Sequence, residues 1–170
     1  MPIAVSWVQL PPESPFLPVP KFDLPYLDFG TVPPGTYSVP QVIGLRFQGC
    51  GVQNIKVWQD GPSCSIYSQD VSAPQLLVAS PAVLALVLNT NGSVTTYQTA
   101  VQSHDPSAFP AMPTTLGSAI SLGDAPLGVN YEAVSAPLAI TILAPSTDHV
   151  DVRDFRLMAA FETTDSPHVP

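Results

Sequence analysis

Apolar and polar residues alternate over several short stretches of this sequence. The alternation is clearest near the C-terminus, where one face of a strand over 154–161 would hold Phe155, Leu157, Ala159 and Phe161. Similar stretches predict strands at 41–48, 52–58, 64–68, 93–101 and 138–143, and a continuous apolar run covers 81–88. An apolar period of 3.6 residues free of Gly and Pro appears only weakly, around 70–88.

Turn signals separate these stretches. Cys50-Gly51, Asp60-Gly61-Pro62 and the segment 89–92 carry the residue types that favour tight turns. Residues 104–118 form a predicted loop rich in Pro, Ser and Thr that contains Phe109 and Met112. Many short strands divided by turns predict an all-β protein, an antiparallel sandwich of the immunoglobulin-like or jelly-roll-like kind.

Prolines concentrate at the N-terminus, where about half of the 21 prolines fall within the first 40 residues. Proline disfavours both helices and central strands. The segment 11–25 also carries large apolar residues between its prolines. We therefore predict an extended Pro-rich arm over 1–25 and a sandwich domain over 26–170. The arm would lie on a neighbouring molecule or, equally, wrap as irregular coil on its own sheet.

The chain contains few charges for its size. Charged residues make up 11% of the 170 residues and hydrophobic residues 45%, and mean hydropathy is +0.25. An ordinary soluble domain has about 25% charged residues. A surface with so few charges is usually covered by another molecule, which favours an obligate subunit of an assembly. A secreted bacterial domain with a surface rich in Ser and Thr is the alternative.

The sign of the charge argues against several partners. Lys and Arg number 5 against 13 for Asp and Glu, giving a net charge of −8. Nucleic acids require a basic surface, and anionic membranes attract one, so we expect neither as a partner. No segment has the roughly 20 apolar residues needed to cross a bilayer. Met1 and the absence of a signal-like segment favour a chain that starts in the cytoplasm, although a removed signal would also fit.

Candidate reactive groups are sparse. Cys50 and Cys64 lie 14 residues apart and could form a disulfide or remain two reduced thiols. No CxxC occurs, and the histidines at 104, 149 and 168 are widely separated, so we expect no metal site. Asp148, Asp151 and Asp154 could offer oxygen ligands to calcium, but no glycine provides the sharp turn of such a loop. A solvated loop is the favoured interpretation.

Catalytic patterns are also lacking in the sequence. His104-Asp105 stands near serines, but no G-x-S-x-G motif accompanies it. The three glutamates, Glu13, Glu132 and Glu162, lie in no context typical of paired catalytic carboxylates. We expect a protein that is not an enzyme and that uses no cofactor. A sugar-stacking platform is conceivable from the aromatic residues Trp7, Trp58, Tyr37, Tyr67, Tyr97 and Tyr131, although core packing is the commoner use.

The stretch 27–47, with Phe29-Gly30, the turn glycine Gly35 and alternating apolar residues after it, resembles the opening of immunoglobulin-like modules. The resemblance implies that a first strand ends at Phe29-Gly30, that 42–47 is its partner and that 54–58 is the next strand. Similar modules recur in virion proteins of tailed phages, where a Leu-Gly-Asp step is followed by two strands. Residues 120–124, 136–145 and 154–161 are similar in order and spacing, whereas 48–51 departs from the usual Asn-x-Gly turn.

This resemblance implies a structural virion protein, a capsid decoration (cement) or other accessory subunit. Its partners would be major capsid or tail subunits and further copies of itself, and it would be located in the virion after assembly in the host cytoplasm. The alternative is a surface adhesin or carbohydrate-binding module that acts through loops such as 104–118. The residues expected to contact partner chains are Trp7, Phe16, Leu17, Phe22 and Tyr26.

Overall fold

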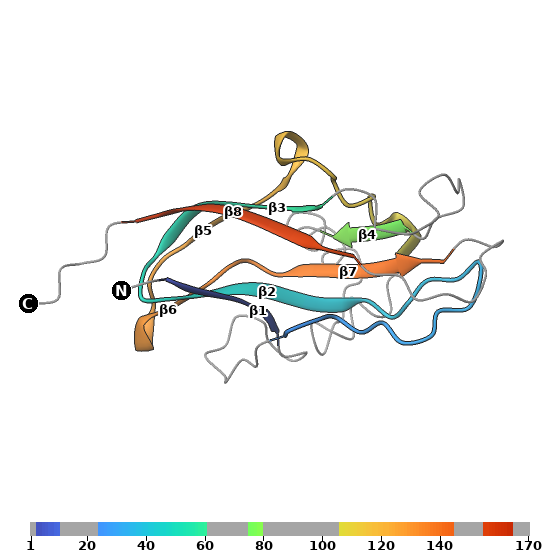
Figure 1. Cartoon of the computed structure of the whole chain (residues 1–170), viewed down its shortest axis with the longest axis horizontal. Helices are drawn as coiled ribbons and strands as arrows, with labels where there is room; N and C mark the ends of the chain where they lie inside the picture. The colour runs from blue at the N-terminus through green and yellow to red at the C-terminus, as the bar shows by residue number, and fades with distance from the viewer. Residues whose placement is uncertain (1–2, 11–23, 61–74, 80–105, 145–154, 165–170) are drawn as a thin grey trace, which may run out of the picture.

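The computed structural model describes residues 3–10, 24–60, 75–79, 106–144 and 155–164. In these segments the chain forms eight β-strands and three short 3-10 helices. The strands make two antiparallel sheets that face each other across a shared core (Figure 1). The predicted all-β antiparallel sandwich is therefore confirmed.

The larger sheet, which we call sheet A, has β1 at one edge and β4 at the other. Its strand order is β1-β2-β7-β4, and β6 pairs with β2 beyond the end of β7. β1 pairs with β2 along one edge of that strand. Both β6 and β7 pair with the opposite edge of β2, one after the other along its length. The strands are β1 (Ala4–Gln9), β2 (Gln41–Gln48), β4 (Gln75–Ala79), β6 (Glu132–Val134) and β7 (Leu138–Leu143).

The smaller sheet, sheet B, has the order β5-β3-β8, with bounds Ile120–Ala125, Val52–Gln59 and Leu157–Thr163. Although β2 and β3 are consecutive in the chain, they belong to different sheets. The turn at Gly49-Cys50-Gly51 therefore carries the chain across the sandwich and does not close a hairpin. Gly49 has a φ of +91°, a conformation that glycine adopts without steric cost.

The main core fills the space between the sheets. Ile43, Leu45 and Phe47 project into it from every second position of β2. Phe47 meets Phe161 of β8 edge-to-face, with ring centroids 4.8 Å apart and planes at 69°, a geometry that aromatic pairs favour. The burial of this apolar surface provides the main driving force for joining the two sheets.

A second apolar cluster lies on the outer face of sheet A, where Val42, Leu77 and Ala139 pack with Val8 and Leu10. Because sheet A is buried on both faces, positions 42–45 of β2 are buried without interruption. This double burial explains why the apolar pattern of β2 alternates only in part.

The N-terminal residues differ from the predicted arm over 1–25. Ala4–Gln9 form β1, which pairs with β2 along its whole length. Val8 and Leu10 are 0% and 2% exposed. The sandwich therefore starts before residue 26, because these residues are held by strand pairing and by burial in the second cluster. The segment 11–23 lies outside the described residues.

The strands predicted at 41–48, 52–58 and 138–143 are confirmed, and the last strand runs over Leu157–Thr163. Four strands were not predicted, namely β1, β4, β5 and β6. The predicted first strand ending at Phe29-Gly30 is wrong, since residues 27–32 belong to no strand. The strands predicted at 64–68 and 93–101 and the apolar run 81–88 lie outside the described residues.

The predicted loop 104–118, described from residue 106, is attached to sheet A. The Val78 amide donates to the Pro110 carbonyl at 2.9 Å, and the Met112 amide donates to the Leu76 carbonyl at 2.8 Å. Phe109 and Met112 are buried, one in each apolar cluster. This segment therefore lines the outer edge of β4.

Candidate interaction surface

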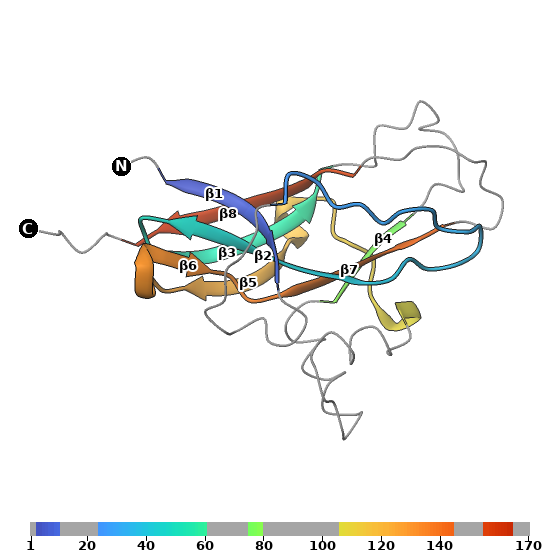
Figure 2. The ribbon, with the colours of Figure 1, turned by 90° about the horizontal axis from the view of Figure 1, so that it is seen from below.

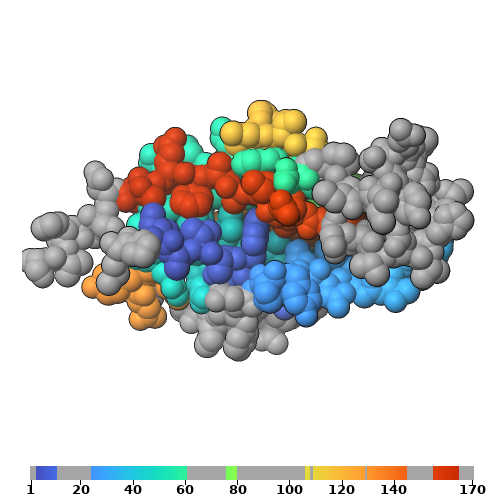
Figure 3. All heavy atoms as spheres, in the orientation of Figure 1, coloured from blue at the N-terminus to red at the C-terminus, as the bar shows by residue number. Residues whose placement is uncertain are grey.

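One narrow side of the sandwich carries the free edges of both sheets. Within the described residues, β1 pairs only with β2, and β8 pairs only with β3. Figure 2 shows β1 and β8 at the same side of the sandwich, and Figure 3 shows their atoms adjacent on the face toward the viewer. We call this surface, formed by residues 3–9 and 156–163, the β1/β8 face.

The β8 edge is apolar and uncharged over five consecutive residues. Leu157–Phe161 has the sequence Leu-Met-Ala-Ala-Phe, and all five residues are half-buried. The charged residues Arg156 and Glu162 flank this run. Edge strands in soluble proteins usually carry charges, prolines or bulges that prevent pairing with another chain. The run 157–161 has neither charge nor proline, and the β3–β8 register is regular beside it from Lys56 to Gln59.

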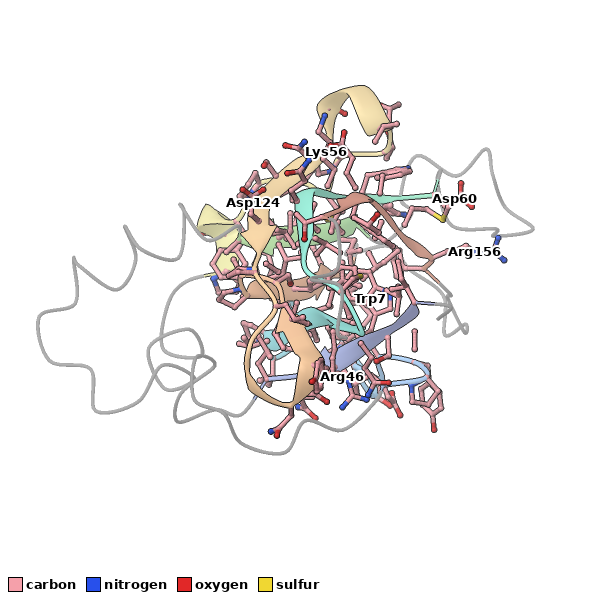
Figure 4. All side chains as sticks on the ribbon, turned by 90° about the vertical axis from the view of Figure 1, so that its left-hand side faces the viewer. Trp7, Arg46, Lys56, Asp60, Asp124 and Arg156 are labelled. Atoms are coloured by element: carbon pink, nitrogen blue, oxygen red, sulfur yellow. The ribbon has the colours of Figure 1, made fainter. Side chains whose placement is uncertain are left out.

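The β1 edge adds exposed apolar side chains to the same face. Ile3 and Val5 are 37% and 42% exposed. Trp7 is half-buried and packs against the main core from β1 (Figure 4). The Leu24 amide donates to the Trp7 carbonyl at 2.8 Å, which occupies one backbone group at the end of the strand. The edge of β1 before Trp7 makes no such bond to the described part of the chain outside β2.

A polar cluster ties the three strands of sheet B together next to this face. At an irregularity in β3, Asn54 has a φ of +55°, and its amide donates to Asp124 Oδ1 at 3.0 Å. The side-chain amides of Asn54 and Gln53 both donate to Glu162 Oε2, at 2.9 and 3.0 Å. These hydrogen bonds, with a smaller contribution from the positive charge of Lys56, lower the pKa of Glu162 below its ordinary value of 4.5. The cluster joins β5, β3 and β8 and therefore fixes the position of the β8 edge.

Among the residues that the structure describes, two ion pairs are exposed or partly exposed. Arg156 Nη1 lies 3.6 Å from Asp60 Oδ2, and Arg46 Nη1 lies 3.6 Å from Glu132 Oε1. Figure 4 shows Asp60 near Arg156, and Arg46 in a separate part of the molecule. The Arg156–Asp60 pair, whose side chains are both exposed, contributes about 0–1 kcal/mol to folding stability.

The described residues contain no group of three or more His, Cys, Asp or Glu side chains placed to hold a metal ion. Cys50 is buried and carries a free thiol, so the structure has no disulfide at this residue. The candidate calcium ligands Asp148, Asp151 and Asp154, and the pair His104-Asp105, lie outside the described residues. No helix in the part of the chain that the structure describes is long and apolar enough to span a membrane.

The expected partner-contact residues separate into three cases. Tyr26 is 74% exposed and remains available for contact. Trp7 contributes to its own core, which leaves only part of its surface for a partner. Phe16, Leu17 and Phe22 lie outside the described residues.

The described aromatic residues do not form one platform. Trp58 follows the buried Val57 and so points to the outer face of sheet B. Tyr37 packs against the cluster on the outer face of sheet A. Tyr131 is 61% exposed, at the turn that precedes β6. Tyr67 and Tyr97 lie outside the described residues.

Comparison with known proteins gives no family assignment for this chain. No protein-family model, curated protein or solved structure matches this chain. Sequence reasoning found the strand that contains 157–161 but did not identify it as an edge. The available signal was the uncharged run between Arg156 and Glu162.

Proposed function

We propose that this protein is a non-enzymatic structural subunit that works by packing against other protein chains. The observation that carries the proposal is the β1/β8 face, where the edge of the uncharged strand β1 lies beside the edge of β8 with its uncharged run 157–161. Unpaired strand edges bind other chains by adding backbone hydrogen bonds and by covering apolar side chains. A protein that acts alone has little use for such a surface.

The composition of the whole chain supports the same proposal. With 11% charged residues, the protein has few groups that would prevent its apolar surfaces from associating. Exposed apolar side chains, among them Val5, Val39, Tyr26 and Tyr131, add to the uncovered apolar area. The excess of acidic residues argues against nucleic acid and anionic membranes as partners.

The narrower proposal is an accessory protein of a tailed-phage particle, a capsid decoration (cement) or related subunit with an immunoglobulin-like sandwich. Its support is the sequence resemblance described above, whose later segments coincide with β5, with β7 and with the first part of β8. The partners would be major capsid or tail subunits. A carbohydrate-binding module has less support, because Trp58 and Tyr37 lie on opposite outer faces of the sandwich.

The direct test is protein mass spectrometry of virus particles purified on density gradients from lysed cultures of the organism that encodes the chain. Co-sedimentation with the shell proteins at a fixed ratio to them, retained after a salt wash, is the expected result. The chain found only in the soluble fraction, while intact particles lack it, would contradict the virion proposal. A host protein of similar abundance serves as the control for carry-over.

A further inference from the structure

The free edge of β8 has opposite charges at its two ends. Arg156 precedes the uncharged run 157–161, and Glu162 follows it. An antiparallel strand with this charge arrangement is complementary to a second copy of itself, because each copy sets its basic end against the acidic end of the other. We infer that two copies of this chain pair through β8, antiparallel, about a two-fold axis at Ala159.

This register matches side chains at every position of the run. Leu157 lies opposite Phe161 of the second copy, Met158 lies opposite Ala160, and Ala159 faces its own counterpart. Arg156 lies opposite Glu162, and the two-fold axis makes this ion pair twice. If the second copy were shifted by two residues along β8, so that Glu162 lay opposite its Met158, both Arg156–Glu162 ion pairs would be lost. The charges therefore select one register among those that keep the apolar face inward.

The two faces of β8 fit this pairing. Leu157, Ala159 and Phe161 pack against the main core from the inner face of sheet B. Their counterparts in the second copy would extend that apolar layer. Met158, Ala160 and the two charged residues share the outer face, where β3 presents Lys56 and Trp58 opposite Ala160 and Met158. Pairing thus joins the two three-stranded sheets into one continuous sheet without burying a charge.

The same axis brings the β1 edges together. Because β1 lies beside β8 on one face of the sandwich, a two-fold rotation that pairs β8 with its copy sets β1 near its copy (Figure 3). Ile3 and Val5, exposed in the single chain, would then lie between the copies. The dimer covers both free edges, which removes the main route to uncontrolled edge pairing.

This inference rests on the proposed role as a structural subunit and names its first partner, a second copy. The first test is sedimentation equilibrium of the full chain over a concentration series. The expected mass is twice that of the 18.0 kDa chain. Arg156→Glu should raise the dissociation constant roughly tenfold, because two exposed ion pairs become two repulsive contacts.

Asp60→Asn is the matched control. It removes the exposed partner that Arg156 has within its own chain, at 3.6 Å, but leaves the contacts between copies intact. Its dissociation constant should therefore stay within about twofold of the parent value. Thermal unfolding of each variant, followed by circular dichroism, separates a weakened dimer from a misfolded chain.

The second test determines which residues of the two β8 strands lie opposite each other. Directly opposite residues in an antiparallel pair hold their Cβ atoms about 4.5–5.5 Å apart. Ala159→Cys should therefore give a covalent dimer with a short thiol-reactive cross-linker, whereas Thr163→Cys should not, since its counterpart lies at the far end of the paired strands. The unmodified chain shows the background from Cys50 and Cys64.

A chain that stays monomeric at all concentrations overturns the inference. So does a dimer whose dissociation constant is unchanged by Arg156→Glu and that does not cross-link through Ala159→Cys. Neither result touches the proposed function if the chain is still found in purified particles. Conversely, a dimer with the expected register in a protein absent from particles would retain this inference and remove the virion role.

Discussion

At the scale of single residues, Gly51 shows how close packing restricts the sequence. A Cβ atom at this position would lie 2.7 Å from Thr164 Oγ1 and 3.0 Å from the backbone nitrogen of Leu127. The turn that carries the chain from sheet A to sheet B therefore passes too close to its neighbours for any side chain. Cβ atoms in proteins essentially never lie as close as 2.7 Å to another heavy atom, so neighbouring atoms would have to move to accept a side chain here.

We predict that Gly51→Ala lowers the free energy of unfolding by about 1–3 kcal/mol through this overpacking. Urea unfolding followed by circular dichroism measures the effect. Gly117→Ala is the control, because Gly117 is exposed and its added Cβ would meet nothing within 4 Å. The control should stay within about 0.5 kcal/mol of the parent, and equal effects for the two variants would contradict the prediction.

Glu162 gives a second prediction at this scale. Its lowered pKa means that the folded chain favours the carboxylate, which accepts hydrogen bonds from Asn54 and Gln53. The stabilisation is therefore fully present above the ordinary pKa of 4.5 and is lost as the pH falls through the lower folded value. Because the group is exposed, the effect should be small.

Glu162→Gln should reduce stability at pH 7 and should flatten the acid limb of the stability profile below pH 4.5. Unfolding midpoints measured from pH 3 to pH 7 for parent and variant provide the test. A constant difference between the two proteins across that whole range would show that ionisation of Glu162 has no role.

At the scale of elements, the junction between β6 and β7 depends on one hydroxyl group. Ser135 lies between these strands and is 5% exposed. Its Oγ accepts a hydrogen bond from the Leu45 amide at 2.9 Å, and its amide donates to the Leu45 carbonyl at 2.9 Å. The side chain thus replaces a backbone acceptor where the ladder along β2 is interrupted.

Ser135→Ala should leave the buried Leu45 amide without its acceptor and cost about 1–3 kcal/mol of stability. Urea unfolding measures the loss. Thr31→Ala, at an exposed position outside the strands, should change stability by less than about 0.5 kcal/mol. If Ser135→Ala left the stability unchanged, another acceptor would have to bind the Leu45 amide, contrary to this prediction.

The N-terminal strand gives the second prediction for an element. Deletion of residues 1–10 removes β1 together with Val8 and Leu10, which are almost fully buried. Loss of these two side chains alone should cost about 3–6 kcal/mol, so we expect a chain that is unfolded or barely stable. Circular dichroism with urea titration measures this, and deletion of residues 1–3, which keeps all of β1, is the control. A stable domain after the longer deletion would return these residues to the role of a docking arm.

At the scale of the whole molecule, net charge opposes association. The chain carries −8 at pH 7, and its isoelectric point is about 4.4. Mutual repulsion therefore decreases as the pH falls toward that value. Because charged residues are few, little else keeps copies apart.

We predict that light scattering at low ionic strength shows stronger association at pH 5 than at pH 7. Added salt at pH 7 should have a similar effect, since it screens the same repulsion. Scattering that does not change with pH or salt would show that net charge does not limit association.

The sequence by itself determined the fold class and several of its strands. Alternation at 138–143 and around 157–161, with prolines and turn residues between such stretches, excludes long helices and requires short strands. That signal is local, because the side chains of a strand point alternately to its two faces. It therefore gave the location of β2, β3, β7 and β8 within a few residues.

Only the tertiary structure decided which strands are edges and which are paired. The pairing of β1 with β2, the separation of β2 and β3 into different sheets, and the attachment of 110–112 to β4 depend on hydrogen bonds between distant residues. Residues 4–10 show no regular alternation, since Val8 and Leu10 are buried on the outer face of sheet A and the half-buried Trp7 packs on the inner face. The β1/β8 face forms because two strands from opposite ends of the chain lie side by side in the fold. The local sequence pattern of either strand does not predict this proximity.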